Sequence, residues 1–321
     1  MRVLSGIQPS GNLHIGNYFG MMKPALALQE DHEVFLFIAD YHALTTVRDA
    51  DRLRQYVQDA ACDFLACGLD PARTTFYRQS DVPEVHELAW LLSGMCPMGL
   101  LERAHSFKDK TARGMDANHA LFAYPVLMAA DILCVNADTV PVGRDQKQHL
   151  EIARDLAGKF NRHTGQEVFK LPDPMIRGEV ALVPGVDGQK MSKSYGNTIE
   201  LFGPPKQVRK TIMKVVTDST PLGEPKDPDT CTVFALYKLF ASEAEAAELA
   251  SRYRAGGMGY GEAKKALADK MDEQFEPFRE KRAFLEAHPD EVEDVLRAGA
   301  QRARETMRPV LQAARAAVGL E

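Results

Sequence analysis

The chain has 321 residues, of which 45% are hydrophobic and 26% are charged, and its formal net charge is −6 at pH 7. This composition is typical of a soluble globular protein with one large domain or two of ordinary size, and it excludes collagen, a coiled coil and disorder as descriptions of the whole chain. No apolar run is long enough for a transmembrane helix, and the apolar start that ends at Gly6 is too short for a signal-peptide core. We therefore expect a cytoplasmic protein with no membrane partner. The net acidity also argues against a non-specific DNA-binding protein.

The cysteines predict no metal centre. There are five of them, an odd number with no CxxC pair, whereas disulfide frameworks, zinc sites and iron–sulfur clusters need paired or closely spaced cysteines. We therefore predict neither zinc nor an iron–sulfur cluster, no metal ion held by the protein itself, and thiols buried as small apolar side chains. They are Cys62, Cys67, Cys96, Cys134 and Cys231.

The first part of the chain alternates predicted strands and helices. Residues 2–6 predict a short strand that runs into a turn, and the continuous apolar run 34–39 predicts a strand buried on both faces, as in a parallel sheet. Apolar residues between 53 and 65 recur at helical spacing, and Gly68 follows where it can end that helix. The segment Thr-Thr-Phe-Tyr-Arg, which ends at Arg78, predicts a third strand.

A mainly helical block is predicted for residues 84–136, with breaks near Pro97 and in the polar segment 108–118. A short strand follows at 139–143, and Asp145 opens a long amphipathic helix. Alternating strands and helices predict an α/β fold with a doubly wound, Rossmann-like parallel sheet, which the helical block interrupts.

The second part of the chain predicts a helical domain. Proline and glycine are frequent between 172 and 228, where we place the domain boundary. Beyond it, Ala, Glu, Lys and Arg predominate, which is typical of helices. We expect a first domain over 1–195, with a helical insertion at about 78–136, and an all-helical domain over 196–321 whose last helix packs back on the first.

The first motif with chemical meaning is the nonapeptide Pro9–Asn17, P-S-G-N-L-H-I-G-N, which follows a strand and opens a helix. Backbone N–H groups at a helix start have no partner within the helix, so they suit a phosphate. Gly11 and Gly16 allow a ligand to approach the backbone, and His14 and Asn17 supply hydrogen-bond donors. The alternative is an ordinary capped turn between a strand and a helix.

The second motif is the pentapeptide K-M-S-K-S at residues 190–194, which follows the glycine-containing segment 184–188. A loop of this kind can carry the two ammonium groups of Lys190 and Lys193 onto a polyphosphate. The alternative for two lysines at this spacing is a solvated basic loop.

Together, H-I-G-N and K-M-S-K-S resemble the signature pair of the class I aminoacyl-tRNA synthetases, and more narrowly the bacterial tryptophanyl members of that family. The resemblance runs from residue 4 to the C-terminus and is most specific in the first half of the chain. It implies a nucleotide-binding domain of the HUP type followed by a helical anticodon-binding domain. The segments that support it are 5–11, 124–133, 140–149 and 154–161.

This resemblance implies a two-step ligase reaction. The carboxylate of L-tryptophan attacks the α-phosphorus of ATP, which binds with Mg²⁺, and gives tryptophanyl-adenylate and pyrophosphate. The 2′-hydroxyl of the terminal adenosine of tRNA(Trp) then accepts the tryptophanyl group. Such chemistry needs positioning and charge neutralisation more than a covalent nucleophile. The resemblance also implies a homodimer that pairs through the helical insertion.

Among the residues at these motifs, the resemblance assigns catalysis to Lys190, Lys193, His14 and Asn17. The two lysines would stabilise the leaving pyrophosphate. Asp145 would accept hydrogen bonds from the ribose hydroxyls, although it is also suited to cap the following helix. The residues implied to contact ATP are Gln8, Pro9, Ser10, Gly16, Asn17, Lys110, Gly143, Arg144, Asp145, Val180, Lys190, Met191, Ser192, Lys193 and Ser194.

Selection of tryptophan is predicted to depend on Asp131. An indole has one polar group, an N–H that only donates, so a selective pocket needs a fixed acceptor within an apolar wall. Asp131 lies in the otherwise apolar segment 124–133, where an unpaired carboxylate would be costly, and Met128 shares its helix face. A buried ion pair is the alternative, and the resemblance favours the indole contact. The resemblance also implies four residues that line or support the tryptophan pocket: His42, Val140, Val142 and Gln146. His42 equally suits a structural role, and Gln146 could contact the amino group of the substrate.

The sequence departs from the family pattern at three places. Leu4 stands where an aromatic side chain is expected over the indole, and Arg144 replaces an acidic residue. Residues 195–197, Tyr-Gly-Asn, follow the lysine loop where many relatives have Asp-Pro, which we interpret as a variant loop exit. Lys110 could contact a phosphate of ATP or could be an ordinary solvated lysine, and the sequence supports the two interpretations almost equally.

Three other functions fit the sequence less well. Tyrosyl-tRNA ligation uses the same chemistry, but a phenol site would need both a donor and an acceptor. A nucleotidyltransferase that never meets tRNA would not need a second domain. A catalytically silent paralogue would not need two intact phosphate motifs.

Two surface features stay open between a structural and a functional interpretation. The apolar stripe in the insertion suits the dimer interface or the core; its members are Leu88, Trp90, Leu91 and Leu92. Basic residues of the second domain suit an anticodon stem or, with balanced charge around them, a solvated helix face; they include Lys264, Lys265, Arg279 and Arg282.

Overall fold

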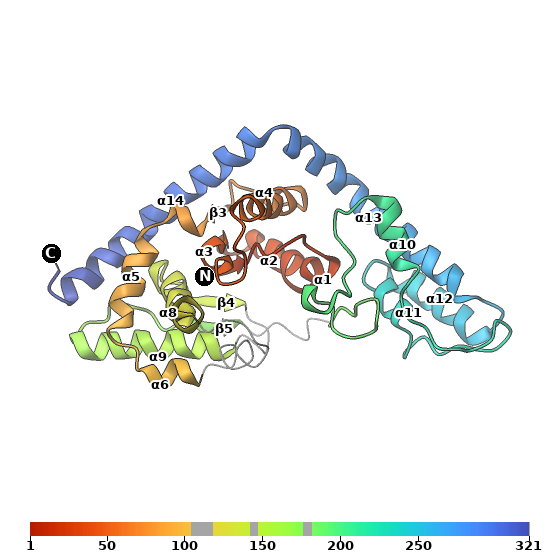
Figure 1. Cartoon of the computed structure of the whole chain (residues 1–321), viewed down its shortest axis with the longest axis horizontal. Coiled ribbons are helices and arrows are strands. Elements are labelled where there is room, and N and C mark those ends of the chain that lie inside the picture. Colours follow the sequence, from red (N-terminus) through yellow and green to blue (C-terminus); the bar gives the residue numbers. More distant parts are fainter. Residues whose placement is uncertain (104–117, 142–146, 176–181, 321) are drawn as a thin grey trace.

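The computed structural model describes residues 1–103, 118–141, 147–175 and 182–320. Within these ranges, five strands form one parallel sheet in the order β3-β2-β1-β4-β5 (Figure 1). The order reverses between β1 and β4, so the predicted doubly wound α/β fold is confirmed. The strands are β1 (Arg2–Ile7), β2 (Glu33–Ile38), β3 (Thr74–Arg78), β4 (Thr139–Pro141) and β5 (Asp173–Met175).

The sequence does not predict strand β5, which reads Asp-Pro-Met. Proline has no N–H for the ladder of hydrogen bonds and is rare inside sheets. Because β5 pairs with β4 alone, in the register Val140 to Pro174, the proline lies on an edge strand, where the missing donor costs little.

The first part of the chain contains the predicted helices. In α4, the Asp49 side chain accepts a 3.0 Å hydrogen bond from the N–H of Arg52 and so caps the first turn, and Gly68 follows the last turn with φ +105°. The predicted block 84–136 forms α5, α6 and α8, and most of the predicted break 108–118 lies outside the described residues. The helices are α1 (Ile15–Asn17), α2 (Lys23–Ala27), α3 (Asp40–Ala43), α4 (Ala50–Ala66), α5 (Glu84–Ser93), α6 (Met98–Glu102), α8 (His119–Cys134) and α9 (Lys147–Thr164). The 3₁₀ and π turns are η1 (Tyr18–Met22), η2 (Leu28–Glu30), η3 (Gln79–Asp81) and η5 (Lys193–Tyr195).

The second part is helical, and its two longest helices form the two arms of an arch over the sheet (Figure 1). The arms meet at Pro289, whose ring cannot continue the preceding helix but suits the first turn of the next. The helices are α10 (Pro205–Ile212), α11 (Thr232–Tyr237), α12 (Glu243–Ala255), α13 (Tyr260–Ala287) and α14 (Pro289–Ala317).

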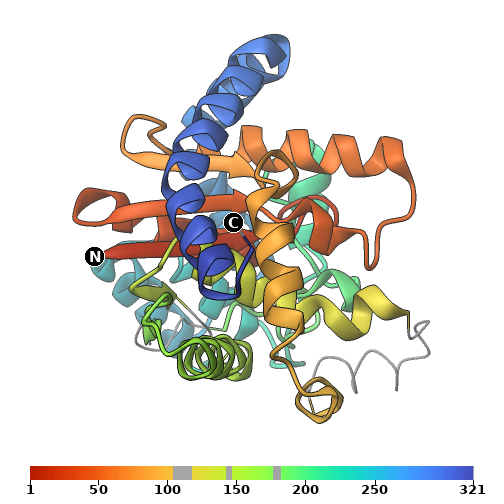
Figure 2. The same ribbon diagram turned by 90° about the vertical axis from the view of Figure 1, so that its left-hand side faces the viewer.

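Helix α14 returns to the sheet and crosses it beside β3, as Figure 2 shows. The approach is close, because a Cβ built on Gly299 would lie 1.7 Å from the carbonyl oxygen of Phe76 in β3. Ion pairs fix the helix along its length: Glu293 binds Arg78 at the end of β3, and Arg304 and Arg308 both bind Glu84 of α5.

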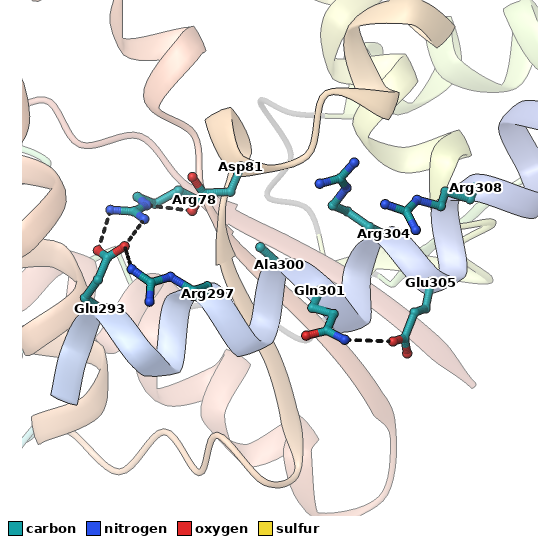
Figure 3. A pocket seen from close by; sticks show the side chains of 9 residues that line it. All are labelled: Arg78, Asp81, Glu293, Arg297, Ala300, Gln301, Arg304, Glu305 and Arg308. Atoms are coloured by element: carbon teal, nitrogen blue, oxygen red, sulfur yellow. Dashed lines mark hydrogen bonds and ion pairs between the residues drawn. The ribbon is translucent and has the colours of Figure 1, made fainter. Parts of the chain in front are cut away.

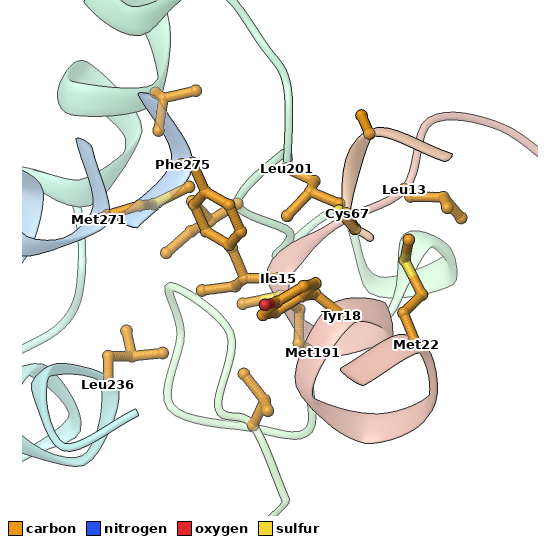
Figure 4. Close-up of a cluster of buried hydrophobic side chains, with 14 of the residues drawn as sticks. Leu13, Ile15, Tyr18, Met22, Cys67, Met191, Leu201, Leu236, Met271 and Phe275 are labelled. Carbon is orange, nitrogen blue, oxygen red and sulfur yellow. The ribbon is translucent and has the colours of Figure 1, made fainter. Parts of the chain in front are cut away.

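The sheet separates two hydrophobic cores, because successive strand residues point to opposite faces. One core includes Val3, Val34, Leu36 and Ile38, and the other includes Leu4, Phe35, Phe37 and Tyr77. The first core continues into the helical part, where Met271 and Phe275 of α13 pack with Ile15, Tyr18 and Met191 (Figure 4). The helical part is therefore joined to the sheet through continuous apolar packing.

Two features of the described chain bear on the class of protein. No described helix combines the length and the apolar character that a membrane span requires. All five cysteines are free thiols, and four of them are buried. Burial of a thiol in apolar surroundings raises its pKa, to about 11 for Cys62.

Candidate active site

Several of the described site residues lie just after the carboxyl ends of strands. β1 leads into the turn of the first motif, β2 leads into the segment that holds His42, and β3 ends immediately before Gln79. The order of strands reverses between β1 and β4, and in open α/β sheets ligands bind outside the strand ends at such a reversal. The fold therefore places the first motif where a nucleotide is expected.

His14 and Asn17 cap the helix that follows β1. The Asn17 N–H donates a 3.3 Å hydrogen bond to His14 Nδ1, and the His14 N–H donates a 3.1 Å hydrogen bond to Asn17 Oδ1. Because Nδ1 accepts, the proton of the neutral imidazole lies on Nε2, which is left as a donor. Burial, and secondarily the positive charge of Lys193, lower the pKa of His14 to about 4, so the ring is neutral at pH 7.

The two motifs are joined by backbone hydrogen bonds. The Ile15 N–H donates to the carbonyl of Ile199 at 3.0 Å, and the Leu201 N–H donates to that of Leu13 at 2.9 Å. The segment that leaves the lysine loop thus pairs with the turn that opens the first helix. A Cβ on Gly16 would lie 2.9 Å from His14 Nδ1, so a side chain there would displace the capping ring.

Lys193 already contacts the first motif. Its Nζ donates a 2.7 Å hydrogen bond to the carbonyl oxygen of Gly11. Burial lowers the pKa of Lys193 to about 8, and the half-buried ammonium is still mainly charged at pH 7. Lys190 is exposed. Met191, predicted to contact ATP, is 5% exposed and packs in the core with Ile15 (Figure 4), so its side chain anchors the loop.

Asn197 organises the lysine loop from within. Its Oδ1 accepts a 2.8 Å hydrogen bond from the Ser192 N–H, and its Nδ2 donates to Asp187 at 2.8 Å and to the Lys190 carbonyl at 3.1 Å. The side chain is 2% exposed, and a Cβ on Gly185 would lie 2.3 Å from its Nδ2. Sequence reasoning noted this residue only as part of a variant loop exit, because its partners become visible only when the loop closes on itself.

Of the remaining predicted contacts, some lie in the described ranges and others lie outside them. Gln8 donates to the His42 carbonyl at 3.2 Å, Pro9 is buried, and Ser10 is exposed in the same turn. Ser192 and Ser194 lie in the lysine loop with their hydroxyls 2.9 Å apart. The predicted residues that lie outside the described ranges are Lys110, Val142, Gly143, Arg144, Asp145, Gln146 and Val180.

Asp131 is buried in α8, with 3% of its surface exposed. Its Oδ2 lies 2.9 Å from His42 Nε2, and Gln79 Nε2 lies 2.8 Å from Oδ1 and 3.0 Å from Oδ2. In the described part of the chain no lysine or arginine pairs with this carboxylate, but His42 Nε2 lies within ion-pair distance of Oδ2, so the alternative of a buried pair stays open with His42 as the partner. Sequence reasoning missed Gln79. The only available signal was its position at the carboxyl end of a predicted strand.

Apolar side chains occupy the same face of the sheet as this carboxylate. Met128 is half-buried on the same helix, Val140 of β4 is 6% exposed, and Leu4 of β1 is 2% exposed. Leu4 and Val140 belong to the core on that face of the sheet, and Met128 packs against it. The carboxylate thus combines two polar neighbours, His42 and Gln79, with an apolar core on the same face, which is compatible with the indole hypothesis.

Two cavities lie near the ends of the strands. One of about 220 Å³ opens beside His42 and Tyr124 and is bordered by Trp90, whose side chain is 78% exposed. The other, of about 430 Å³, lies between α14 and the end of β3 (Figure 3). Its lining includes no residue of either motif, and Arg78 and Glu293, which border it, are paired with one another.

Of the four basic residues named in the helical part, Lys265 is exposed, as a solvated face requires, whereas Arg279 and Arg282 differ from both interpretations. Arg282 binds Asp63 and Asp59 of α4, and Arg279 binds Asp272. The side chains of both arginines are about four-fifths or more buried, with exposures of 15% and 16%. Lys264 donates to the carbonyl of Met213 at 3.1 Å. Arg282 therefore joins α13 to α4, Arg279 is paired within α13, and neither arginine belongs to a solvated face.

Comparison with known proteins agrees with this geometry. The family model for class I tRNA synthetases of the W and Y type matches residues 1–276. A tryptophan–tRNA ligase of Rhodopirellula baltica is 56% identical over 320 residues, which is all of both chains. The crystal structure of a tryptophanyl-tRNA synthetase from Campylobacter jejuni, complexed with ADP and tryptophan, superposes with a TM-score of 0.95 at 50% identity over both whole chains. One from Mycoplasma pneumoniae gives 0.85 at 31% identity, over 100% of this chain and 98% of that one.

Proposed function

The chain belongs to the class I tRNA synthetases of the tryptophan and tyrosine type, and we propose that it is a tryptophan–tRNA ligase. The observation that carries tryptophan as the substrate is Asp131, a buried carboxylate in an apolar frame beside the strand ends. An indole N–H is a donor with no acceptor, so it complements a carboxylate. The likeness over the whole chain to relatives named tryptophan–tRNA ligase supports the same substrate.

The proposed reaction has two steps. A carboxylate oxygen of L-tryptophan attacks the α-phosphorus of ATP, the bond to the bridging oxygen breaks, and pyrophosphate leaves from tryptophanyl-adenylate. The 2′-hydroxyl of the 3′-terminal adenosine of tRNA(Trp) then attacks the activated carbonyl, and AMP leaves. The relative crystallised with ADP and tryptophan supports a nucleotide and an amino acid as joint ligands.

Each motif residue has a proposed part in the first step. Lys193 and Lys190 neutralise the charge that develops on pyrophosphate, which is the main requirement of phosphoryl-type transfer. The neutral ring of His14 donates from Nε2, and Asn17 holds its tautomer through the cap. Gln8, Pro9 and Ser10 border the nucleotide, as do Gly16 and the loop residues Met191, Ser192 and Ser194.

Outside the described ranges, the nucleotide and tryptophan contacts proposed on the resemblance are Lys110, Val142, Gly143, Arg144, Asp145, Gln146 and Val180. His42, Met128 and Val140 complete the proposed tryptophan pocket, where His42 contacts Asp131 directly.

Magnesium is proposed to enter with ATP as its counter-ion. In the described ranges, no three His, Cys, Asp or Glu side chains gather closely enough to hold a metal ion. Mg²⁺ commonly keeps several waters and binds through substrate phosphates, so the phosphate oxygens of ATP are a sufficient donor set. The bound ion would supply charge neutralisation at those phosphates.

The proposed assembly is a homodimer that binds tRNA(Trp) in the cytoplasm, where its substrates are found. On α5, Leu88 and Leu92 are fully buried, whereas Trp90 is 78% exposed and Met98 on α6 is 63% exposed. Exposed large apolar side chains of this kind mark protein contacts. We place the anticodon-binding domain at 196–321, after a catalytic domain at 1–195 with its insertion at about 78–136. Sedimentation of the purified chain tests the dimer.

Pyrophosphate exchange into ATP, run with each of the twenty amino acids and no tRNA, tests the proposed function. Exchange with tryptophan alone is the expected result. Exchange with tyrosine would reject the indole contact of Asp131 while keeping the chemistry. No exchange in folded protein would favour a silent paralogue or a transferase that does not use amino acids.

A further inference from the structure

The buried carboxylate of Asp131 has a nearly complete set of hydrogen bonds. Among the described residues, Oδ2 faces His42 Nε2 at 2.9 Å and Gln79 Nε2 at 3.0 Å, while Oδ1 faces only Gln79 Nε2, at 2.8 Å. Each carboxylate oxygen has about two acceptor sites. Oδ2 is therefore filled by the protein, and one acceptor site on Oδ1 is left for a ligand.

The orientation of the Gln79 amide follows from this contact. An ionised carboxylate only accepts hydrogen bonds, so the NH₂ end of the amide must face it. The other end is then left over: among the described residues, Gln79 Oε1 is buried with no hydrogen-bond partner. A buried acceptor without a partner costs free energy, which an apolar side chain of similar volume would avoid. The amide therefore has a function that its donor end serves.

The backbone around Gln79 cannot move easily. The side chain itself is fully buried. Arg78, the preceding residue, binds Asp81 at 2.7 Å and both oxygens of Glu293 in α14 at 2.8 Å. The amide N–H groups are thus held against Asp131 from a turn that Arg78 ties both to Asp81 within the turn and to α14.

We propose that Gln79 is a positioning residue for amino-acid selection: it holds Asp131 so that Oδ1 alone is open to the N–H of the indole. This inference rests on the proposed function. Gln79 should therefore affect the binding only of ligands whose ring donates a hydrogen bond to Oδ1. A substrate whose ring has the same shape but no N–H, such as β-(3-benzothienyl)alanine, gains nothing from the alignment of Oδ1, and a site built for a donor rejects it.

The test compares Gln79→Met with the unaltered chain in pyrophosphate exchange, using tryptophan and β-(3-benzothienyl)alanine in parallel. Methionine fills the same space without a donor. We expect kcat/KM for tryptophan to fall roughly 10- to 100-fold, mainly through KM, as for the loss of a hydrogen bond to a charged group. The value for the analogue should change less than about threefold, so the preference for tryptophan collapses. Equal losses for both substrates, or no loss for either, would overturn the inference.

The matched control is Ser80→Ala in the same turn, because the Ser80 hydroxyl bonds Asp40 and not Asp131. It should keep the preference for tryptophan. If Gln79→Met does not fold, Gln79→Asn serves instead. Asparagine keeps a buried amide, but its side chain is one methylene shorter and draws the donor away from Asp131. The preference of this variant for tryptophan over the analogue must also fall. No tryptophan-dependent exchange in the unaltered chain would overturn the proposed function and this inference together. A preserved preference in both Gln79 variants would overturn this inference alone.

Discussion

Lys193 Nζ and the Gly11 carbonyl oxygen lie 2.7 Å apart, although 182 residues separate them in the chain. The contact joins the lysine loop to the turn after β1, and it uses the same ammonium that we propose to neutralise pyrophosphate. Gly11 has φ +129°, and a Cβ there would lie 3.7 Å from the lysine side chain. The backbone of the first motif therefore holds Lys193 at the site before ATP contacts it.

The charge of Lys193 predicts a pH dependence. Its pKa of about 8 means that the ammonium is present below pH 8 and is lost as the pH rises through that value. We expect kcat/KM for ATP in pyrophosphate exchange to fall about tenfold for each pH unit above 8. In Lys193→Arg the charge persists to much higher pH, so this decline should disappear even where activity is lower.

Removal of the charge should have a large effect at neutral pH. For Lys193→Ala we expect adenylation to slow by about 10²- to 10³-fold, the usual effect of losing one donor to a developing negative charge, with little change in tryptophan binding. Lys206→Ala, an exposed lysine of α10, is the control and should behave as the unaltered chain. An equal loss of tryptophan affinity in Lys193→Ala would contradict the role on the leaving group.

Asp131→Asn should damage tryptophan binding and spare ATP binding. The asparagine amide has a single oxygen, and the donors of Gln79 and His42 occupy both of its acceptor sites. No acceptor is then left for the indole N–H. We expect the dissociation constant of tryptophan, measured by equilibrium dialysis, to rise about 10²-fold or more. Asp138→Asn is a matched control, because Asp138 also accepts hydrogen bonds, from Arg2 and Lys170, on another part of the molecule. An unchanged tryptophan dissociation constant would remove Asp131 from the pocket.

Asn197→Ala should loosen the lysine loop. It deletes three side-chain hydrogen bonds, worth about 1 kcal/mol each, and we expect KM for ATP to rise severalfold with tryptophan affinity unchanged. Asn161→Ala is a matched control, since Asn161 also makes three such bonds, to the backbone of Val168 and Phe169. It should lower the unfolding temperature to a similar extent without changing KM for ATP. The same rise in KM in both variants would show a general loss of stability.

Gly299→Ala should detach α14 from the sheet. The new methyl group would lie 1.7 Å from the Phe76 carbonyl oxygen, and backbone atoms cannot yield as a flexible side chain can. We expect a loss of several kcal/mol in the free energy of unfolding. Gly261→Ala in α13 meets open space and should stabilise the chain by up to about 1 kcal/mol. Urea unfolding of both variants measures the difference, and equal stabilities would contradict the close packing.

Local sequence determined much of this fold. The apolar run 34–39 and the helical spacing between 53 and 65 correctly predicted β2 and α4, because each pattern reflects burial against one layer. Strand β5 was missed because its proline contradicts strand propensity and only its edge position makes the proline acceptable. Element type is therefore predictable where the side chains alone show which faces are buried.

The site was predictable in a different way. His14 and Lys193 were found from motifs, and the structure brings their two segments together. The hydrogen bonds of Gln79 and Asn197 could not be predicted, since each depends on the conformation of a partner far away or across a closed loop. The burial of the Met191 side chain in the core was not predicted either, because a motif does not show which way each side chain points; its proposed contact with the nucleotide stays a prediction.

The crossing of α14 over β3 also sets an order of events during synthesis. Arg78 and its partner Glu293 are 215 residues apart, and ribosomes add about 5–20 residues per second. The end of β3 therefore waits roughly 10–40 s for the helix that covers it. In that interval a nascent sheet offers an uncovered strand to other chains, which is a hazard for aggregation. Slow translation of the long helical part would lengthen this exposure, so the newly made chain is expected to need chaperone protection most before α14 emerges.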